Sequence, residues 1–288
     1  MSRLDLFIFH VFAPVAQGIG RQPPELKTAG SSPAGRTNFL YISFQKIIAV
    51  LFEIFRIDCD RCYRLSVFDM KQIWIIGAGR FGKKAVSAIK KCYPVSAITV
   101  VDHCPKACEA IADPGLTTVC MDGVSYLNQN LTDADEPGWV IPVIPVHLAY
   151  AWIRLRLLPD IAIVPVDIPE MICRSLPNVF PGKAGEIFVS NASFLCPENC
   201  SEPQDICTHT RMPRKQSLFQ AIAALSCNGF LNLVLQSEQL APGIGGIRPS
   251  AFFNTLVAVK QYPESILLST ACRCHGVVQA FTKKITEG

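Results

Sequence analysis

Short apolar runs alternate with amphipathic segments from residue 71 onward. The run Lys-Gln-Ile-Trp-Ile-Ile at 71–76 is rich in β-branched residues and predicts a strand buried on both faces of a sheet. Residues 83–91 place alanine, valine and isoleucine near one face and lysines elsewhere, which predicts a helix. A second apolar run at 97–101 predicts another strand. The order strand, helix, strand is typical of a parallel α/β unit.

The alternation continues through the rest of the chain. Pro142 and Pro145 interrupt one of the later runs, and proline cannot donate to a sheet ladder, so that run is expected at a sheet edge or strand end. Ser250, after Pro249, is a suitable N-cap for a helix. Further strands are expected at 116–121, 139–147, 161–166, 186–190, 231–235 and 265–269, and helices at 217–225 and 250–262.

This pattern predicts an α/β fold with a doubly wound, mainly parallel, Rossmann-like sheet and a C-terminal α/β extension. We expect an NAD(P)-binding Rossmann domain over 70–168 and a cysteine-containing α/β region over 169–288.

A glycine-rich turn joins the first predicted strand to the first helix. Its sequence is Gly77-Ala78-Gly79-Arg80-Phe81-Gly82. The first glycine permits a tight turn, the second lets a diphosphate approach the backbone, and the third lets the helix pack closely on the strand. The helix N-terminus then offers free N–H groups and a positive dipole end to phosphates.

An acidic residue ends the second predicted strand at the spacing that a dinucleotide site requires. Asp102 follows Gly82 by twenty positions, where a carboxylate can accept hydrogen bonds from the adenosine ribose. A carboxylate there favours NAD over NADP because it repels a 2′-phosphate. His103 and Lys106 lie close behind and weaken that preference.

The segment Ile75–Gly82 resembles the start of the TrkA-type NAD-binding (RCK N-terminal) domains of potassium uptake regulators. It is also similar to the openings of saccharopine-dehydrogenase-like and other Rossmann oxidoreductases. The resemblance spans residues 70–113. It implies a cofactor site at Gly77, Gly79, Arg80, Phe81, Gly82 and Asp102. For the regulator family it also implies a potassium transporter as partner.

The first sixty-nine residues lack the pattern of apolar runs and amphipathic segments seen from residue 71 onward. Ala13–Gly20 and Gly30–Gly35 resemble the translated D-arm and T-arm of a tRNA gene, and the segment shows no period of 2 or 3.6. We therefore expect residues 1–69 to be spurious or disordered and Met70 to be the true start. The alternative is a genuine extension with an amphipathic helix. A peptide from upstream of Met70 in mass spectra of the native protein would exclude the first interpretation.

The loop after the fourth predicted strand commonly borders the cofactor in Rossmann domains. His147 and Trp152 either face the nicotinamide or form a structural histidine beside a core tryptophan. A second glycine-rich stretch at 237–246 follows a predicted strand, and it either presents backbone N–H groups to an anion or serves as a connector.

Two cysteine groups follow predicted strands far apart in the chain. Because the carboxyl ends of parallel strands share one edge of a sheet, the two groups are expected to meet in space. Thiolates and imidazoles suit zinc and iron–sulfur clusters, although the spacing matches no standard motif. The candidate metal ligands are Cys196, Cys200, Cys207, Cys272 and Cys274, with His209 and His275 nearby.

Other roles for these thiols stay open. They can be inert small hydrophobes, or one can be a nucleophile with His209 or His275 as its base. Disulfides are disfavoured by a dinucleotide fold without a signal peptide, which indicates a reducing, cytoplasmic location.

Composition narrows the class of partner. Of 288 residues, 17% are charged, the net charge is +4, and the lysines and arginines are scattered, so neither nucleic acid nor a membrane surface is indicated. The apolar stretch at 139–158 contains two arginines, a histidine and two prolines, which argues against a membrane span.

We therefore expect an NAD(P)-binding, oxidoreductase-type protein with a cysteine-lined site that holds zinc or an iron–sulfur cluster and takes a small-molecule substrate. The alternative is a TrkA-like, NAD(H)-sensing regulatory subunit of potassium transport. The sequence names no catalytic residue, and it leaves a homo-oligomer open.

Overall fold

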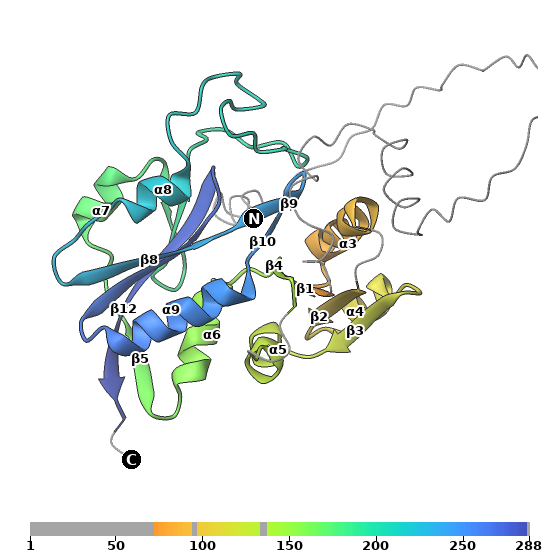
Figure 1. The fold of residues 1–288 in the computed structure, drawn as a ribbon, viewed down its shortest axis with the longest axis horizontal. Helices are drawn as coiled ribbons and strands as arrows, with labels where there is room; N and C mark the ends of the chain where they lie inside the picture. The colour runs from red at the N-terminus through yellow and green to blue at the C-terminus, as the bar shows by residue number, and fades with distance from the viewer. Residues whose placement is uncertain (1–71, 94–96, 133–136, 287–288) are drawn as a thin grey trace, which may run out of the picture. The chain divides into compact units, whose positions relative to one another are not determined.

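The structure is a computed structural model that describes residues 72–93, 97–132 and 137–286 (Figure 1). These residues fall in one compact unit. The stretch at 1–69, for which we predicted a spurious origin, lies outside the described residues.

The first sheet has four parallel strands in the order β3-β2-β1-β4. The parallel Rossmann-like arrangement predicted from the alternating pattern is therefore confirmed. Its strands are β1 (Gln72–Ile76), β2 (Ala97–Asp102), β3 (Leu116–Cys120) and β4 (Trp139–Pro142), and its helices are α3 (Arg80–Cys92), α4 (Pro105–Ile111) and α5 (Gly123–Asn130).

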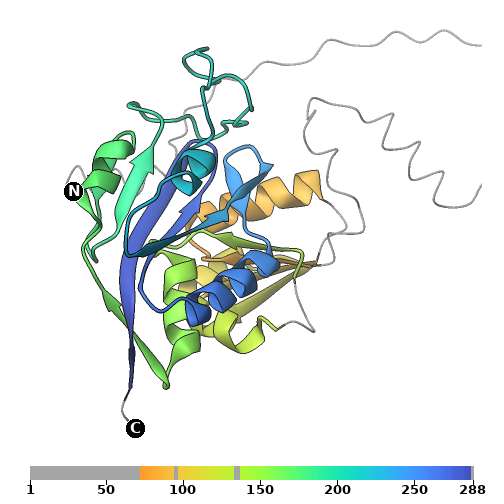
Figure 2. The same ribbon diagram turned by 60° about the vertical axis from the view of Figure 1, so that its left-hand side comes forward.

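The second sheet is mixed, with the order β6-β7-β12-β11-β8 and with β5 also paired to β12. The long strand β12 is antiparallel to β11, β7 and β5, whereas β8 and β11 are parallel (Figure 2). The strands are β5 (Ile161–Pro165), β6 (Val179–Pro181), β7 (Ile187–Ser190), β8 (Phe230–Gln236), β11 (Ser265–Ala271) and β12 (His275–Ile285).

Helices cover both faces of the second sheet. Successive side chains of a strand point to opposite faces of the sheet. In β11, Ile266 and Leu268 accordingly belong to one core cluster and Leu267 belongs to the other. The first cluster includes α6 (Leu148–Leu157) and α9 (Pro249–Gln261), and it also takes in apolar residues of the first sheet. The second cluster includes α7 (Glu170–Ser175) and α8 (Leu218–Ala223).

The predicted strand at 139–147 is shorter in the structure. β4 ends at Pro142, and the residues up to His147 form a loop before α6. Proline supplies no N–H to continue the ladder, and the strand ends at the first of the two prolines instead of at residue 147; β4 lies at the edge of the sheet.

Trp152, in α6, is fully buried and packs edge-on against Phe252 and Phe253 of α9. The structural interpretation therefore holds for Trp152. The domain boundary expected at 168/169 stays a prediction, and the structure pairs β5, which precedes that boundary, with β12 of the second sheet.

A short hairpin connects the two sheets. Its strands β9 (Glu238–Ala241) and β10 (Ile244–Gly246) occupy the second glycine-rich stretch. Just after it, Ile247 forms an antiparallel bridge with Val140 of β4. None of the helices among the described residues has the length and apolar character needed to cross a bilayer.

Candidate dinucleotide site and adjoining cavity

The turn between β1 and α3 has little room at two of its three glycines. Gly77 has a φ of +119°, and a Cβ there would lie 2.8 Å from the carbonyl oxygen of Val143. A Cβ at Gly82 would collide with the carbonyl oxygen of Gly77. At Gly79, by contrast, no atom lies within 4 Å of a built Cβ. The middle glycine thus faces open space, as the approach of a diphosphate requires.

The first turn of α3 is ready to receive an anion. Gly79 is the N-cap residue, it makes no side-chain cap hydrogen bond, and the turn contains no acidic residue. The helix N-terminus therefore keeps its positive dipole end without a carboxylate of its own.

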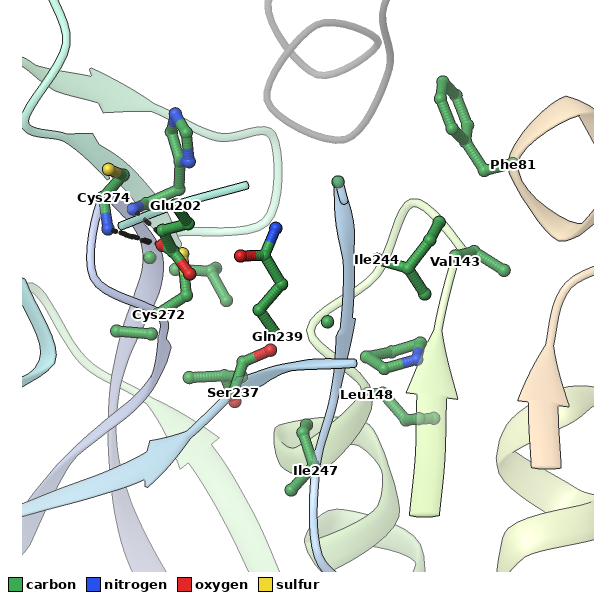
Figure 3. A pocket seen from close by; sticks show the side chains of 18 of the residues that line it. Phe81, Val143, Leu148, Glu202, Ser237, Gln239, Ile244, Ile247, Cys272 and Cys274 are labelled. Carbon is green, nitrogen blue, oxygen red and sulfur yellow. Dashed lines mark hydrogen bonds between the residues drawn. The ribbon is translucent and has the colours of Figure 1, made fainter. Parts of the chain in front are cut away.

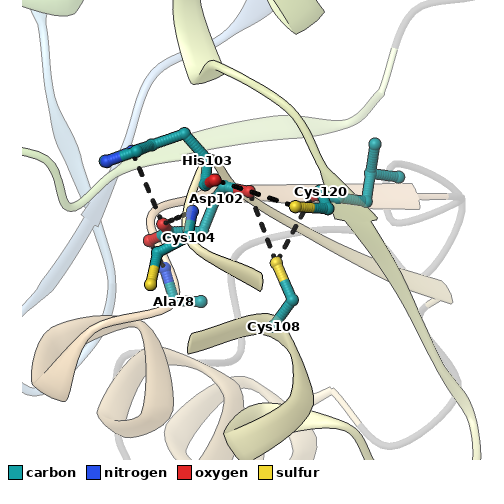
Figure 4. Close-up of polar contacts among 7 residues, drawn as sticks. Ala78, Asp102, His103, Cys104, Cys108 and Cys120 are labelled. Atoms are coloured by element: carbon teal, nitrogen blue, oxygen red, sulfur yellow. Dashed lines mark hydrogen bonds and ion pairs between the residues drawn. The ribbon is translucent and has the colours of Figure 1, made fainter. Parts of the chain in front are cut away.

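Asp102 lies at the end of β2, directly beside this turn (Figure 4). Its Oδ2 accepts a hydrogen bond from the Ala78 N–H at 2.7 Å, and its Oδ1 accepts one from the Cys104 N–H at 2.8 Å. The carboxylate thus fixes the turn in place. Each oxygen still has lone-pair capacity for a ribose hydroxyl.

Cys108 and Cys120 lie near Asp102 in a structural role. The Cys108 thiol donates to the carbonyl oxygens of Asp102 at 3.3 Å and of Val119 at 3.7 Å (Figure 4). Burial and the neighbouring Cys120 raise the pKa of the Cys108 thiol, so this thiol is a protonated, small core side chain.

A loop from the second half of the chain reaches α3. We call residues 196–202 the cysteine loop. Its Glu198 carboxylate forms ion pairs with Arg80 at 3.9 Å and with Lys84 at 3.7 Å, and Lys84 Nζ also donates to the Glu198 carbonyl oxygen. Burial lowers the pKa of Lys84, and Glu198 opposes that shift.

The hairpin β9–β10 holds the cysteine loop from the other side. The Gly243 N–H donates to the Cys200 carbonyl oxygen at 3.0 Å, and Gln239 Nε2 donates to the same oxygen at 2.6 Å. Gly243 has a φ of +73°, and a Cβ there would collide with the Glu198 carbonyl oxygen. The loop is therefore clamped between α3 and the hairpin.

A cavity of about 180 Å³ opens beside these elements (Figure 3). Phe81 of α3 and the loop after β4 line one wall, and the end of β11, the start of β12 and the cysteine loop line the opposite wall. The carboxyl ends of β4 and β11 both border it, as expected for a ligand site in an α/β protein.

His147 lines this cavity and is 8% exposed. Its Nε2 lies 3.0 Å from the Thr270 hydroxyl, its buried Nδ1 makes no hydrogen bond of ordinary geometry with the described residues, and the Gln279 side chain lies close enough to act on the pKa of the ring. Burial lowers the pKa of His147 to about 4, and the Gln279 side chain partly opposes the shift. The imidazole is thus neutral near pH 7 and borders the cavity, whereas its predicted position facing a nicotinamide stays a prediction.

The structure brings the two cysteine groups together. β7 and β11 are both antiparallel to β12, so their carboxyl ends share one edge. Four thiols line the cavity, and Cys207 lies close enough to act on the pKa of Cys196. The four lining residues are Cys196, Cys200, Cys272 and Cys274.

Glu202 and Arg214 complete this cluster. Glu202 is 7% exposed, has a φ of +46°, and its Oε1 accepts a hydrogen bond from the Cys274 N–H at 3.1 Å (Figure 3). Arg214 Nη1 donates to Cys274 Sγ at 2.7 Å. Residues other than glycine with a positive φ are uncommon, and they cluster at functional sites.

Three thiols of this cluster have raised pKa values, whereas hydrogen bonds with Thr210 lower the pKa of Cys207 despite its partial burial. Burial raises the pKa of Cys196 to about 12 and that of Cys274 to about 11, and it raises the pKa of Cys272 well above its usual value. Metal binding needs thiolates, and no three His, Cys, Asp or Glu side chains of the described segments are grouped as metal ligands. This arrangement does not fit a resident metal.

Comparison with known proteins separates the described chain into two parts. Residues 73–145 match the family model of the TrkA-N domain. The first part of the described chain is a TrkA-type segment. Residues 149–284 match a family model described as "Uncharacterized protein, C-terminal domain".

The chain is 27% identical over 223 residues to a protein of Archaeoglobus fulgidus, itself named "Uncharacterized protein". The alignment covers 73% of this chain and 98% of that protein. No solved structure matches the chain.

Sequence reasoning missed several residues of this region, including Glu198, Glu202 and Gln239. They reach the cavity from loops and a short hairpin, where hydrophobic periodicity gives no signal. The sequence clues were the positions of Glu198 and Glu202 within or beside the first cysteine group and of Gln239 in the second glycine-rich stretch.

Proposed function

We propose that this protein binds NAD(H) at the turn between β1 and α3. The observation that carries the proposal is the contrast within that turn, where Gly77 and Gly82 are needed for packing and Gly79 alone faces open space. Gly79 and the N–H groups that follow it, including those of Arg80 and Phe81, would hold the diphosphate, and Asp102 would hold the adenosine ribose. The match to the TrkA-N domain supports this assignment.

NAD(H) is favoured over NADP(H) by charge. A 2′-phosphate beside Asp102 would meet a carboxylate that is already fixed by two backbone N–H groups and cannot turn away. Calorimetric titration of the full chain with NADH and NADPH tests the proposal. We expect saturable binding of NADH and at least roughly tenfold weaker binding of NADPH. Absence of saturable NADH binding would overturn the assignment.

Two roles follow from a bound nucleotide. The cavity, with His147 and the thiols on its walls, favours an oxidoreductase-type protein in which the coenzyme supplies hydride transfer and the cavity takes a small substrate. The TrkA-N match favours an NAD(H)-sensing regulatory subunit of potassium transport in the cytoplasm. Turnover of NADH with an electron acceptor supports the first role. Co-purification with a potassium transporter and no turnover supports the second.

A zinc or iron–sulfur site at Cys196, Cys200, Cys207, Cys272 and Cys274 stays a proposal that requires these side chains to rearrange and lose their protons. The gathering of the thiols around one cavity is what supports it. Metal analysis of anaerobically prepared protein, with a visible spectrum taken under nitrogen, tests it. A colourless sample with far less than one zinc or iron per chain would exclude the site.

A further inference from the structure

Two cavity-lining residues have a buried polar atom without a hydrogen bond to the described residues: Glu198 Oε1, which forms a 3.9 Å ion pair with Arg80, and His147 Nδ1. A buried polar atom without a hydrogen bond is costly, so two such atoms on one cavity indicate a ligand that supplies the missing hydrogen bonds. Neither atom belongs to the glycine turn or to Asp102, so they concern the part of the ligand beyond the diphosphate.

The strand order of the first sheet indicates which part of a bound nucleotide lies near Glu198 and His147. In the first sheet, chain connections reverse direction between β1 and β4, and ligands of open α/β sheets lie across such a switch point. The adenosine side belongs over β2, where Asp102 lies. The group after the second phosphate therefore lies on the β4 side, where Phe81, Glu198 and His147 line the cavity.

We propose that Glu198 selects a nucleotide whose diphosphate continues into a second ribose and rejects one that continues into a third phosphate. The inference rests on the proposed binding of NAD(H) and adds a rule for the class of ligand. A ribose hydroxyl can donate to Glu198 Oε1, whereas a further phosphate brings negative charge toward the same carboxylate.

The position of Glu198 makes the selection strong. Its carboxylate is tied to Arg80 and Lys84, so it cannot swing away from an incoming phosphate without giving up both ion pairs. Its carbonyl oxygen is held by Lys84 and is packed against Gly243. The two ion pairs also partly neutralise Arg80 and Lys84, the cations to which a third phosphate would otherwise bind.

The test uses three ligands on the full chain in magnesium-free buffer: NADH, ADP-ribose and ATP. ADP-ribose keeps the second ribose without the nicotinamide, and ATP keeps the adenosine and diphosphate. Wild-type protein is expected to bind ADP-ribose at least about tenfold more tightly than ATP. In Glu198→Gln, which removes the charge and keeps the shape, this preference is expected to fall by about tenfold.

The control is Glu109→Gln, which removes an equal charge from the exposed surface of α4 and is expected to leave the preference unchanged. Equal binding of ATP and ADP-ribose by the wild type would overturn the inference even if Glu198→Gln fails to fold. An unchanged preference in a folded Glu198→Gln would overturn it as well. In both cases binding of NADH leaves the proposed function intact, whereas absence of NADH binding by the wild type removes the proposed function itself.

Discussion

Asp102 shows how one side chain can serve both the fold and the ligand. It accepts backbone hydrogen bonds from Ala78 and Cys104, which sets the shape of the turn, and it is the residue that we expect to receive the ribose. Both tasks require acceptor oxygens, which explains why an acid rather than an amide stands there.

Replacing Asp102 by Asn is therefore expected to affect stability and specificity together. The amide group would point a donor at a backbone donor, which should lower the free energy of unfolding by about 1–3 kcal/mol. Loss of the charge should weaken NADH binding about tenfold and NADPH binding less, as measured by urea unfolding and calorimetry. Asp160→Asn, on the surface of the second half, serves as the control. A variant that keeps the wild-type preference for NADH would contradict this role of Asp102.

The residues that sequence could identify are those with a fixed offset from the glycine turn. Gly77, Gly79, Gly82 and Asp102 follow from spacing within one β–α–β unit. Glu198 could not be found this way, because its proximity to Arg80 depends on a loop more than a hundred residues away. Contacts of that kind are set by tertiary packing and leave no periodic trace.

At the scale of elements, the cysteine loop is the part most dependent on its neighbours. It contains no helix or strand of its own, and its backbone carbonyl oxygens are bound by Lys84, Gln239 and Gly243. Its conformation therefore depends on the fit of Gly243, the residue at which a side chain has no space.

Gly243→Ala is expected to loosen the cysteine loop. The new Cβ would collide with the Glu198 carbonyl oxygen, and the positive φ adds a backbone penalty of about 1 kcal/mol. Faster labelling of Cys196 and Cys200 by a thiol reagent, followed by mass spectrometry, measures the effect. Gly229→Ala is the matched control, because Gly229 also has a positive φ, of +80°, but its nearest neighbour lies 3.8 Å away. Equal labelling rates in the two variants would contradict the clamp.

Element prediction succeeded where apolar runs were short and well separated, as for β2, β7 and β11. It missed β12, the central strand of the second sheet. The cysteine group just before this strand indicated the end of the strand pattern, and the apolar residues of β12 are interrupted by Gln279 and two lysines. The stretch at 237–246 forms a β-hairpin, whereas its glycines had suggested only an anion-binding loop or a connector.

For the whole molecule, the sequence predicted a parallel sheet and could not predict that the second sheet is mixed. Apolar runs locate strands but do not give their direction. The direction is set by the tight turn at Cys272–Cys274, which returns the chain antiparallel along β11. The same turn places the second cysteine group beside the first and so creates the cavity.

Two histidines with lowered pKa values make the stability of the whole molecule dependent on pH. Burial lowers the pKa of both His147 and His275 from 6.5 to about 4. The unfolded chain therefore binds more protons between pH 6.5 and 4, and the free energy of unfolding is expected to fall as pH drops through that window. The loss is on the order of 3 kcal/mol for each histidine.

Urea unfolding at several pH values measures this dependence. The double variant His147→Gln, His275→Gln should show a flatter profile than the wild type below pH 6.5. A double variant with the full wild-type slope would show that other groups cause the loss.

The central claim is that the bare backbone at Gly79 holds the diphosphate of an adenine dinucleotide, and the most direct test compares NADH titration of the wild type with that of Gly79→Val. The added side chain meets no atom of the protein within 4 Å at its Cβ, so the variant should fold normally by circular dichroism and thermal unfolding. We predict that it loses at least about tenfold in affinity because the side chain occupies the space of the diphosphate. NADH binding of wild-type strength in the folded variant would contradict the claim.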